Sequence, residues 1–226
     1  MRLHLFAKRL HISLVVNLKG EKLMYLKFFK RAIELILCIL LLPFLLVISI
    51  VVALLIIVED RGSPFFIAAR MGMNGRKFRM YKFRSMYINA PDIRNPDGST
   101  YNADNDLRIT KIGKFLRRTS IDELPQIINV IIGNMSLIGP RPTMIPDIPY
   151  DNLEPIIKKR YSVRPGITGY SQAFFRNSIS QDNKFKYDNY YVDHISFMLD
   201  MQIVIKTIAS VIKRDYINNS DDYKKV

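Results

Sequence analysis

The chain of 226 residues has little of the chemistry that cross-links or metallates small proteins. Its single cysteine is Cys38, which excludes an intrachain disulfide and a cysteine metal site. The three histidines, His4, His11 and His194, are scattered without the spacing of metal ligands. There are no internal repeats. This length leaves room for one ordinary domain, or for a small domain with a membrane element.

Acidic residues are scarce, with 20 Asp and Glu against 34 Lys and Arg, so the formal net charge is +14. A soluble protein of this charge suggests nucleic acid as a partner. A membrane protein of this charge suggests anionic lipid or phosphorylated substrates. Nucleic-acid binding predicts basic residues interleaved with exposed aromatic residues, whereas here they cluster beside an apolar run. We therefore expect a membrane as partner and no nucleic acid.

The apolar run covers residues 35–58 and contains no charge. A continuous helix of this length would measure about 36 Å, enough to cross a hydrocarbon core of about 30 Å. The run starts too late, is too long and lacks the small-residue cleavage site of a removable signal peptide. The simplest interpretation is a single transmembrane anchor.

Two features weaken that interpretation. Pro43 lies inside the run and would kink a helix. Both flanks are basic, with eight Lys or Arg in residues 1–31 and seven, without any acid, in residues 61–90. Because positive flanks prefer the cytoplasmic side, a helix that bends near Pro43 and returns satisfies both ends. From the residues alone, a re-entrant and a spanning helix are equally open.

The remaining chain reads as short elements joined by loops. Residues 1–25 mix apolar and basic residues and suggest an interfacial helix or strand. The amphipathic segment 195–213, with a polar side that includes Asp200 and Lys206, could pack in the core or lie on a membrane surface, and we favour core packing. The other expected elements are strands at 65–67 and 78–83, a surface loop at 89–106, helices at 111–118, 123–132 and 152–161, a structured loop at 133–150 and a turn at 164–169.

Two adjacent carboxylates, Asp122 and Glu123, lie where a helix should begin, with Pro125 in its first turn. A helix start offers free N–H groups and the positive end of the dipole, which suit phosphate and a reactive carboxylate. Taken alone, the pattern favours an ordinary capping box, in which Glu123 pairs with Ser120 and Asp122 is a first-turn acid.

Arginines accompany this acid pair. Arg117 and Arg118 lie just upstream and can clamp phosphate oxygens. Arg141 stands between two prolines, which presents its guanidinium with little backbone freedom. Taken alone, that segment is more often a surface turn. Residues 82–84 and 164–166 allow the same two interpretations.

Together, the order and spacing of these segments resemble the monotopic phosphoglycosyl transferases of the bacterial sugar transferase family, over about residues 27–210. The acid-pair segment with the Pro-Arg-Pro loop is highly specific, and the chain length resembles the small members, which act on undecaprenyl phosphate. The segments that carry the resemblance are Lys30-Arg31, the apolar run broken by Pro43, YKFRSM at 81–86, RIT at 108–110, LRRTSIDELPQ at 116–126, NV at 129–130, GNMS at 133–136, GPRP at 139–142 and PGITG at 165–169.

For the fold, the resemblance implies an α+β, mostly helical protein. Its parts would be a single proline-broken re-entrant membrane helix with its bend at Pro43, interfacial amphipathic helices and a small cytoplasmic catalytic domain. The implied divisions are a basic N-terminal extension at 1–26, the re-entrant helix at 27–60 and the catalytic domain at 61–226. The implied location is the bacterial inner membrane, with the active site facing the cytoplasm.

For the chemistry, the resemblance implies that Asp122 attacks the β-phosphate of a UDP-sugar, releases UMP and carries the phosphosugar to a polyprenyl phosphate lipid. Covalent catalysis of this kind divides one difficult displacement into two. Mg²⁺ would neutralise the diphosphate, with Asp122 and Glu123 as its ligands. Glu123 is alternatively the base for the lipid phosphate. The candidates for phosphate binding are Arg117 and Arg141, and more weakly Lys82 and Arg84.

The sequence departs from the family pattern at several positions. Leu42 precedes the bending proline where serine is usual, and serine could bond a carbonyl freed in lipid. The other departures are Glu34, Ala68, Ser85 and Asn134. None of them touches the acid pair or Arg141, so we expect an enzyme, and a non-catalytic scaffold is the rival hypothesis. The sequence does not identify the sugar, the glycan pathway, the oligomeric state or the roles of 1–25 and 89–106.

Overall fold

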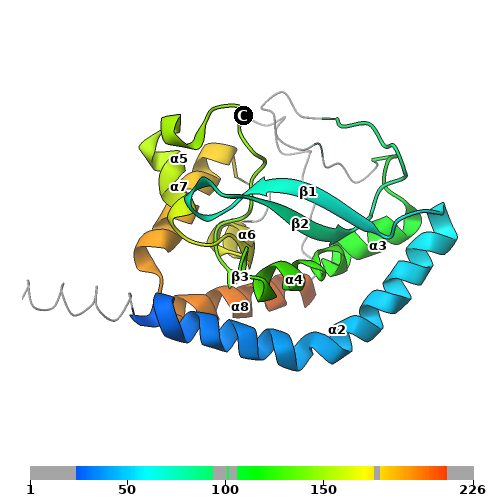
Figure 1. Cartoon of the computed structure of the whole chain (residues 1–226), viewed down its shortest axis with the longest axis horizontal. Helices are drawn as coiled ribbons and strands as arrows, with labels where there is room; N and C mark the ends of the chain where they lie inside the picture. Colours follow the sequence, from blue (N-terminus) through cyan, green and yellow to red (C-terminus); the bar gives the residue numbers. More distant parts are fainter. Residues whose placement is uncertain (1–23, 94–100, 102–105, 176–178, 213–226) are drawn as a thin grey trace, which may run out of the picture.

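The computed structural model describes residues 24–93, 101, 106–175 and 179–212. In these residues the chain is mostly helical, with two small sheets (Figure 1). The elements in order are the π-helical turn η1 (Tyr25–Phe29), α2 (Lys30–Asp60), β1 (Phe65–Met71), η2 (Met73–Gly75), β2 (Lys77–Phe83), α3 (Lys111–Thr119), η3 (Ile121–Glu123), α4 (Gln126–Ile131), β3 (Ser136–Ile138), η4 (Tyr150–Asn152), α5 (Pro155–Lys159), η5 (Arg160–Ser162), β4 (Gly166–Thr168), α6 (Tyr170–Phe175), α7 (Gln181–His194) and α8 (Phe197–Ile212).

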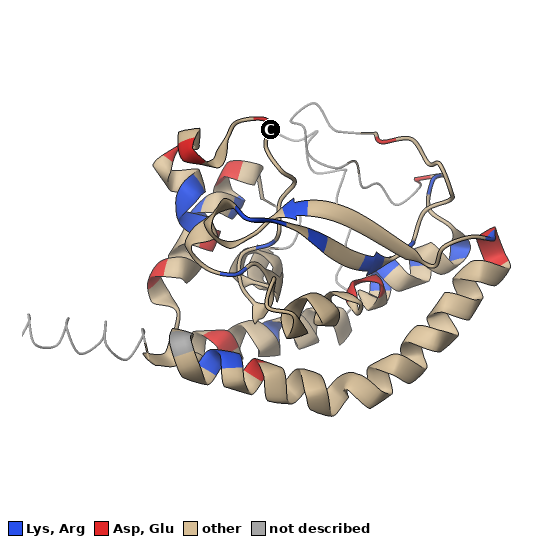
Figure 2. Cartoon of the chain, in the orientation of Figure 1, with Lys and Arg blue, Asp and Glu red and all other residues tan. Residues whose placement is uncertain are grey.

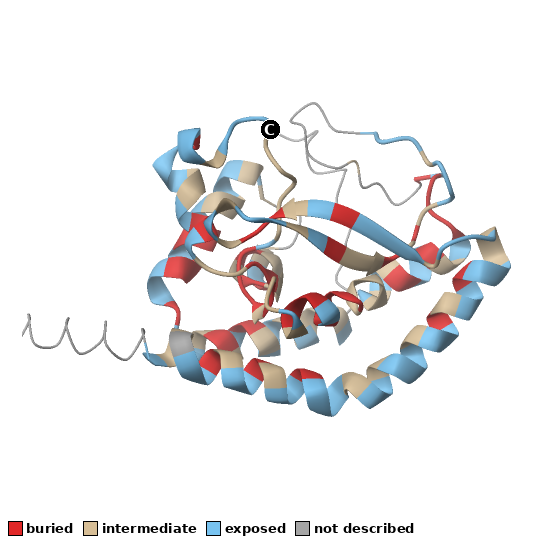
Figure 3. Ribbon diagram, viewed as in Figure 1, coloured by how far each residue is buried: buried red, intermediate tan, exposed pale blue. Residues whose placement is uncertain are grey.

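Helix α2 is long and apolar enough, by length and composition, to cross a membrane. It contains Pro43, and its ribbon bends so that both ends turn toward the rest of the molecule (Figure 1). Its middle carries no charge (Figure 2) and its outer face is exposed (Figure 3). Phe44, for example, is 70% exposed. So large an apolar surface is unfavourable in water, and it supports association with a membrane.

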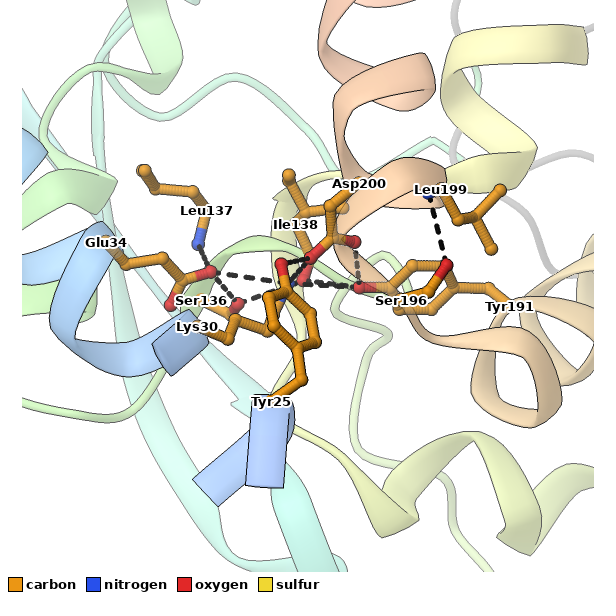
Figure 4. Close-up of polar contacts among 10 residues, drawn as sticks. All are labelled: Tyr25, Lys30, Glu34, Ser136, Leu137, Ile138, Tyr191, Ser196, Leu199 and Asp200. Atoms are coloured by element: carbon orange, nitrogen blue, oxygen red, sulfur yellow. Dashed lines mark hydrogen bonds and ion pairs between the residues drawn. The ribbon is translucent and has the colours of Figure 1, made fainter. Parts of the chain in front are cut away.

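A buried polar network holds the first turn of α2 (Figure 4). The Lys30 ammonium lies 2.5 Å from Asp200 Oδ2 and 3.5 Å from Glu34 Oε1. The hydroxyls of Tyr25 and Tyr191 both donate to the Asp200 carboxylate, each at 2.7 Å. Lys30 is 8% exposed and Asp200 only 1%. The charge of Lys30 is therefore neutralised inside the protein, by a residue of α8.

Glu34 extends the same network to the smaller sheet. Its Oε1 accepts a hydrogen bond from the hydroxyl of Ser136 and another from the N–H of Leu137, at 3.1 Å. Ser136 and Leu137 belong to β3. The start of α2 is thus attached to β3 as well as to α7 and α8.

The other end of α2 is attached to the same body by two acidic residues. The Glu59 carboxylate accepts from the N–H groups of Lys111 and Ile112, at 2.7 and 2.9 Å, and so satisfies the free donors at the start of α3. Arg84 at the end of β2 donates to the Asp60 carbonyl at 2.7 Å. Because both ends are held, the bend of α2 is part of the fold.

The two sheets are small and of opposite type. Strands β1 and β2 form an antiparallel hairpin, with Phe65 opposite Phe83 and Met71 opposite Lys77. Strands β3 and β4 are parallel. The backbone of Gly139, just after β3, lies very close to that of Gly166 in β4. A Cβ added to Gly166 would lie 2.1 Å from the Gly139 nitrogen, so only glycine fits there. One core cluster packs α2, the hairpin and α4 together through Cys38, Ala68, Met80, Ile127, Val130 and Met135.

Most of the expected elements are present. The strands of the hairpin and helix α3 confirm the predictions, and α5 with η5 fills the predicted helix at 152–161. The turn expected at 164–169 was wrong, because residues 166–168 pair with β3 as a strand. Helices α6 and α7 were not predicted. Most of the loop 89–106 and residues 1–23 lie outside the described residues.

Helix α8 buries fewer of its apolar side chains than its amphipathic pattern predicted. Asp200, expected on its polar side, is buried together with Ile203. Phe197, Met198 and Ile205 are at least half exposed, so core packing accounts for only part of its apolar surface.

Replacing Lys30 by methionine should destabilise the protein strongly. The variant leaves the buried Asp200 carboxylate without its cation, a change that typically costs about 3–5 kcal/mol. Chemical unfolding in nanodiscs measures the loss. The control is Lys158→Met, because Lys158 pairs at 3.6 Å with the 91% exposed Asp151 and should contribute nothing measurable. Equal stability of the two variants would contradict the importance of this network.

Candidate active site

The acid pair is placed by a sharp change of direction between two helices. Helix α3 ends at Thr119, and Ser120 follows with a left-handed backbone (φ 57°) that closes α3 and starts η3. Asp122 and Glu123 lie in this single turn, and Pro125 precedes α4. The capping box expected from Ser120 and Glu123 is wrong, because the Ser120 side chain makes no capping hydrogen bond. Ser120 instead ends α3, which leaves the Glu123 carboxylate for other partners.

Glu123 is held between two cations from different parts of the chain. Its Oε1 lies 2.7 Å from Lys82 Nζ, on β2, and 3.2 Å from Arg141 Nη2, in the loop after β3. Burial alone would raise the pKa of Glu123, but the two cations outweigh it and lower the pKa to about 2. Figure 2 shows the acidic turn of η3 beside basic residues at the end of the hairpin. Glu123 is therefore an ionised and paired carboxylate at any physiological pH.

The pKa of Asp122 shifts in the opposite direction to that of Glu123, although the two residues share their surroundings. Burial raises its pKa to about 6, and the neighbouring charge of Glu123 adds to the effect. The positive charges of Lys82, Arg117 and Arg141 oppose the rise without reversing it. Two adjacent carboxyl groups with pKa values pushed apart commonly divide the work of acid–base or nucleophilic chemistry.

Arg117 approaches the pair from α3. Its Nε donates to the Ser85 hydroxyl at 2.9 Å, and its charge acts on Asp122. Burial lowers the pKa of the Arg117 guanidinium, while the Asp122 carboxylate partly opposes this shift. The position of Ser85 depends on Gly113, where an added Cβ would lie 2.0 Å from the Ser85 carbonyl oxygen.

The structure thus brings together four of the predicted site residues around Asp122, namely Glu123, Lys82, Arg117 and Arg141. Arg84 is directed elsewhere, because it bonds the carbonyl of Asp60 at the end of α2. Pro43 lies inside α2. The functional roles assigned to all of these residues are still predictions.

Two polar residues that support the site had no role assigned from the sequence, although Asn129 belongs to the segment 129–130 that carries the family resemblance. Asn129 on α4 is fully buried; its Oδ1 accepts from the Tyr81 N–H at 3.0 Å and its amide donates to the Arg79 carbonyl at 2.7 Å. It thus pairs with β2 as a neighbouring strand would, and it keeps Lys82 beside the acid pair. The second is Arg160, which bonds the Arg141 carbonyl. The sequence offered no signal for the burial of Arg160, which follows Lys158 and Lys159 in a basic stretch.

Mg²⁺ at the acid pair is still a prediction from the family resemblance. Among the described residues there is no group of three or more His, Cys, Asp or Glu side chains that could hold a metal. Mg²⁺ does not need such a group, because it usually takes one or two carboxylates and fills its remaining positions with water and substrate phosphate. The oxygen donors of Asp122 and Glu123 fit a Mg²⁺ that binds together with a diphosphate.

These features describe a protein with a long, exposed apolar helix and a pair of adjacent carboxyl groups surrounded by positive charge. The chain belongs to the bacterial sugar transferase family, whose model matches residues 25–214. The chain is 37% identical to a UDP-N-acetylgalactosamine-undecaprenyl-phosphate N-acetylgalactosaminephosphotransferase of Aeromonas hydrophila, over 82% of this chain and 44% of that protein. It is 35% identical to a UDP-glucose:undecaprenyl-phosphate glucose-1-phosphate transferase of Klebsiella pneumoniae, over 85% of this chain and 41% of that protein.

A third relative is closer to this chain in length. The chain is 39% identical to the exopolysaccharide production protein PSS of Rhizobium leguminosarum bv. phaseoli, over 76% of this chain and 87% of that protein. By contrast, the matches span less than half of the Aeromonas and Klebsiella proteins. The names of those two relatives also differ in their sugar at similar identity, so sequence identity does not select a donor.

Replacing Asp122 by asparagine should stabilise the protein at neutral pH. The pKa of Asp122 is raised on folding, so its carboxyl group favours the folded state below about pH 4 and loses that contribution as pH rises through about 6. The asparagine variant avoids this loss, and we expect a gain of about 1 kcal/mol at pH 7.5, since Asp122 is only partly buried.

Unfolding of both proteins at pH 4.5 and 7.5 measures this difference. The gain should shrink at the lower pH, and Asp147→Asn, in the exposed loop beyond Arg141, should show no such dependence. A loss of stability in the Asp122 variant at pH 7.5 would show that the carboxylate is not strained by its burial.

Proposed function

We propose that this protein transfers a phosphosugar from a UDP-sugar to a polyprenyl phosphate such as undecaprenyl phosphate. The observation that carries the proposal is the acid pair, in which one carboxylate is neutralised by cations and its neighbour is not. The named activities of the Aeromonas and Klebsiella relatives support the substrate classes. The positive charges around the pair suit an anionic donor and an anionic lipid acceptor.

Asp122 is the nucleophile in this proposal. Glu123 Oε1 is held by Lys82 and Arg141, and its low pKa makes it a weak nucleophile. Asp122 has the higher pKa, so its ionised form is the more reactive of the two. An Asp122 oxygen forms a bond to the β-phosphorus, and the bond from that phosphorus to the bridging oxygen breaks. UMP leaves with the electron pair, and the phosphosugar stays on Asp122.

The second half of the reaction reverses the role of Asp122. An oxygen of the polyprenyl phosphate attacks the same phosphorus, the bond to Asp122 breaks, and the products are a polyprenyl diphosphate sugar and the free carboxylate. Arg117 and Arg141 hold phosphate oxygens in both halves, with Lys82 nearby. A Mg²⁺ bound by Asp122 and Glu123 would supply charge neutralisation for the diphosphate.

The membrane arrangement follows from the way α2 is held. We propose that α2 is re-entrant, entering and leaving one leaflet with its bend near Pro43. Lys30 at one end and Glu59 at the other are both bonded to the same body, which lies on one side of the exposed apolar middle. A site facing the cytoplasm at the inner membrane would then meet soluble UDP-sugar and the lipid headgroup together.

The reaction is tested by UMP release from protein in nanodiscs with undecaprenyl phosphate, Mg²⁺ and a panel of UDP-sugars. One donor should give UMP, and Asp122→Asn should reduce the rate at least about 1000-fold, because it removes the nucleophile. The donor kcat/KM should rise with pH toward a plateau above about 6 as Asp122 ionises.

Asp147→Asn is the matched control and should keep its activity. UMP release by the Asp122 variant would place the nucleophile elsewhere. If every donor fails, mass spectrometry should search for a phosphosugar on Asp122, and its absence would favour a non-catalytic scaffold.

The re-entrant arrangement is tested separately by labelling single cysteines in a Cys38→Ser background. Cysteines at Phe29 and Arg61, at the two ends of α2, should react with an impermeant reagent from the same side of sealed vesicles. Reaction from opposite sides would mean that α2 spans the membrane.

A further inference from the structure

Arg160 is a buried arginine that does not touch the acid pair. It opens η5 and is only 3% exposed. Its Nη2 donates to the Arg141 carbonyl oxygen at 2.7 Å and to Asp188 Oδ2 at 2.6 Å. One nitrogen atom therefore joins the carboxylate of α7 to the backbone of the Pro-Arg-Pro loop.

The hydrogen bond to the Arg141 carbonyl fixes the position of the Pro-Arg-Pro loop backbone. Arg141 lies between Pro140 and Pro142, so its neighbours have fixed φ angles and Pro142 offers no N–H group. The preceding carbonyl, of Pro140, is held by the Gly166 N–H at 2.9 Å. The Arg141 side chain itself is 51% exposed, so packing does little to orient it. Its direction depends on the two anchored carbonyls together with the contact of its Nη2 with Glu123 Oε1 at 3.2 Å.

Asp188 restricts the movement of the Arg160 guanidinium. It is 1% exposed and also accepts a hydrogen bond from Ser171 at 2.8 Å. The Arg160 guanidinium lies 4.9 Å from the centre of the Phe185 ring. Its Nε and Nη1 are buried and have no hydrogen-bond partner among the residues that the structure describes, which is unfavourable. A pair that served stability alone would gain more from a bidentate contact with Asp188.

We infer that Arg160 is a positioning residue, which with Asp188 holds the Arg141 carbonyl and so directs the Arg141 guanidinium toward the phosphates of the donor. This inference rests on the proposed function, in which Arg141 binds those phosphates. Arg160 acts through Arg141 and not on the substrate.

The chain provides a matched control for the attachment of α5 to α7. Lys159, next to Arg160, pairs with Asp193 of α7 at 2.6 Å. The side chains of Lys159 and Asp193 are 43% and 49% exposed. This pair joins α5, which directly precedes η5, to the same helix α7 and does not involve the Pro-Arg-Pro loop, so Lys159→Met should leave donor use unchanged.

The experiment is a double-mutant cycle on the full chain in nanodiscs. Arg160→Lys keeps a positive charge beside Asp188 and should lower the donor kcat/KM about tenfold or more, because small misplacements of a binding group are costly. In an Arg141→Ala background the same change should have almost no effect. A second readout is the rise in Tm caused by UMP, which should fall in Arg160→Lys only when Arg141 is present.

A second variant guards against poor folding. Arg160→Met with Asp188→Leu removes the buried pair as a whole, which proteins often tolerate, and should show the same loss of donor kcat/KM. Full donor kcat/KM in that folded variant, or equal effects with and without Arg141, would overturn the inference. So would unfolding of both variants, because the pair would then serve stability alone. If the wild-type protein forms no UMP with any donor, it is the proposed function that fails, and the Tm readout still tests the link from Arg160 to Arg141.

Discussion

The structure depends on the fastening of one apolar helix at both of its ends. Lys30 is bonded inside the protein to Asp200, and Glu59 satisfies the free N–H groups of α3. An exposed apolar helix held at one end could adopt many directions relative to the domain. Two attachments to one body select a bent helix with its middle turned away, and Pro43 makes the bend less costly because a helical hydrogen bond is already missing there.

This fastening also sets the position of the candidate site. The Glu59 carboxylate fixes the start of α3, and the end of α3 leads directly into the turn that carries Asp122. On the other side, Cys38 of α2 packs against Ile127 and Val130 of α4, the helix that follows the turn. The acid pair is therefore held between two helices that both contact α2. A site built this way keeps a constant height above whatever surface receives the apolar middle of α2.

Much of this organisation was accessible from the sequence, because it depends on local patterns. An uncharged run with a proline predicted a long membrane helix, whose bend was favoured only by the family resemblance, and the two strands of the hairpin were predicted separately. The acid pair and Arg141 were recognised as chemical candidates. The sequence misassigned what depends on distant partners: Ser120 resembles an N-cap until its left-handed backbone is seen, and Asp200 resembles a surface residue until Lys30 is found beside it. The supporting role of Asn129 and the burial of Arg160 were missed for the same reason.

The division of labour between Asp122 and Glu123 shows how distant partners create chemistry. The two residues are adjacent and share their cations, yet only Glu123 lies within bonding distance of Lys82 and Arg141. Direct pairing lowers the pKa of one carboxyl, and burial beside that paired charge raises the other. A nucleophile for phosphorus must be ionised but not fully neutralised, and it must also leave again. In the reaction that we propose, Asp122 meets these requirements because the cations bind its neighbour directly, so the supporting residues around Glu123 are as important to Asp122 as its own environment.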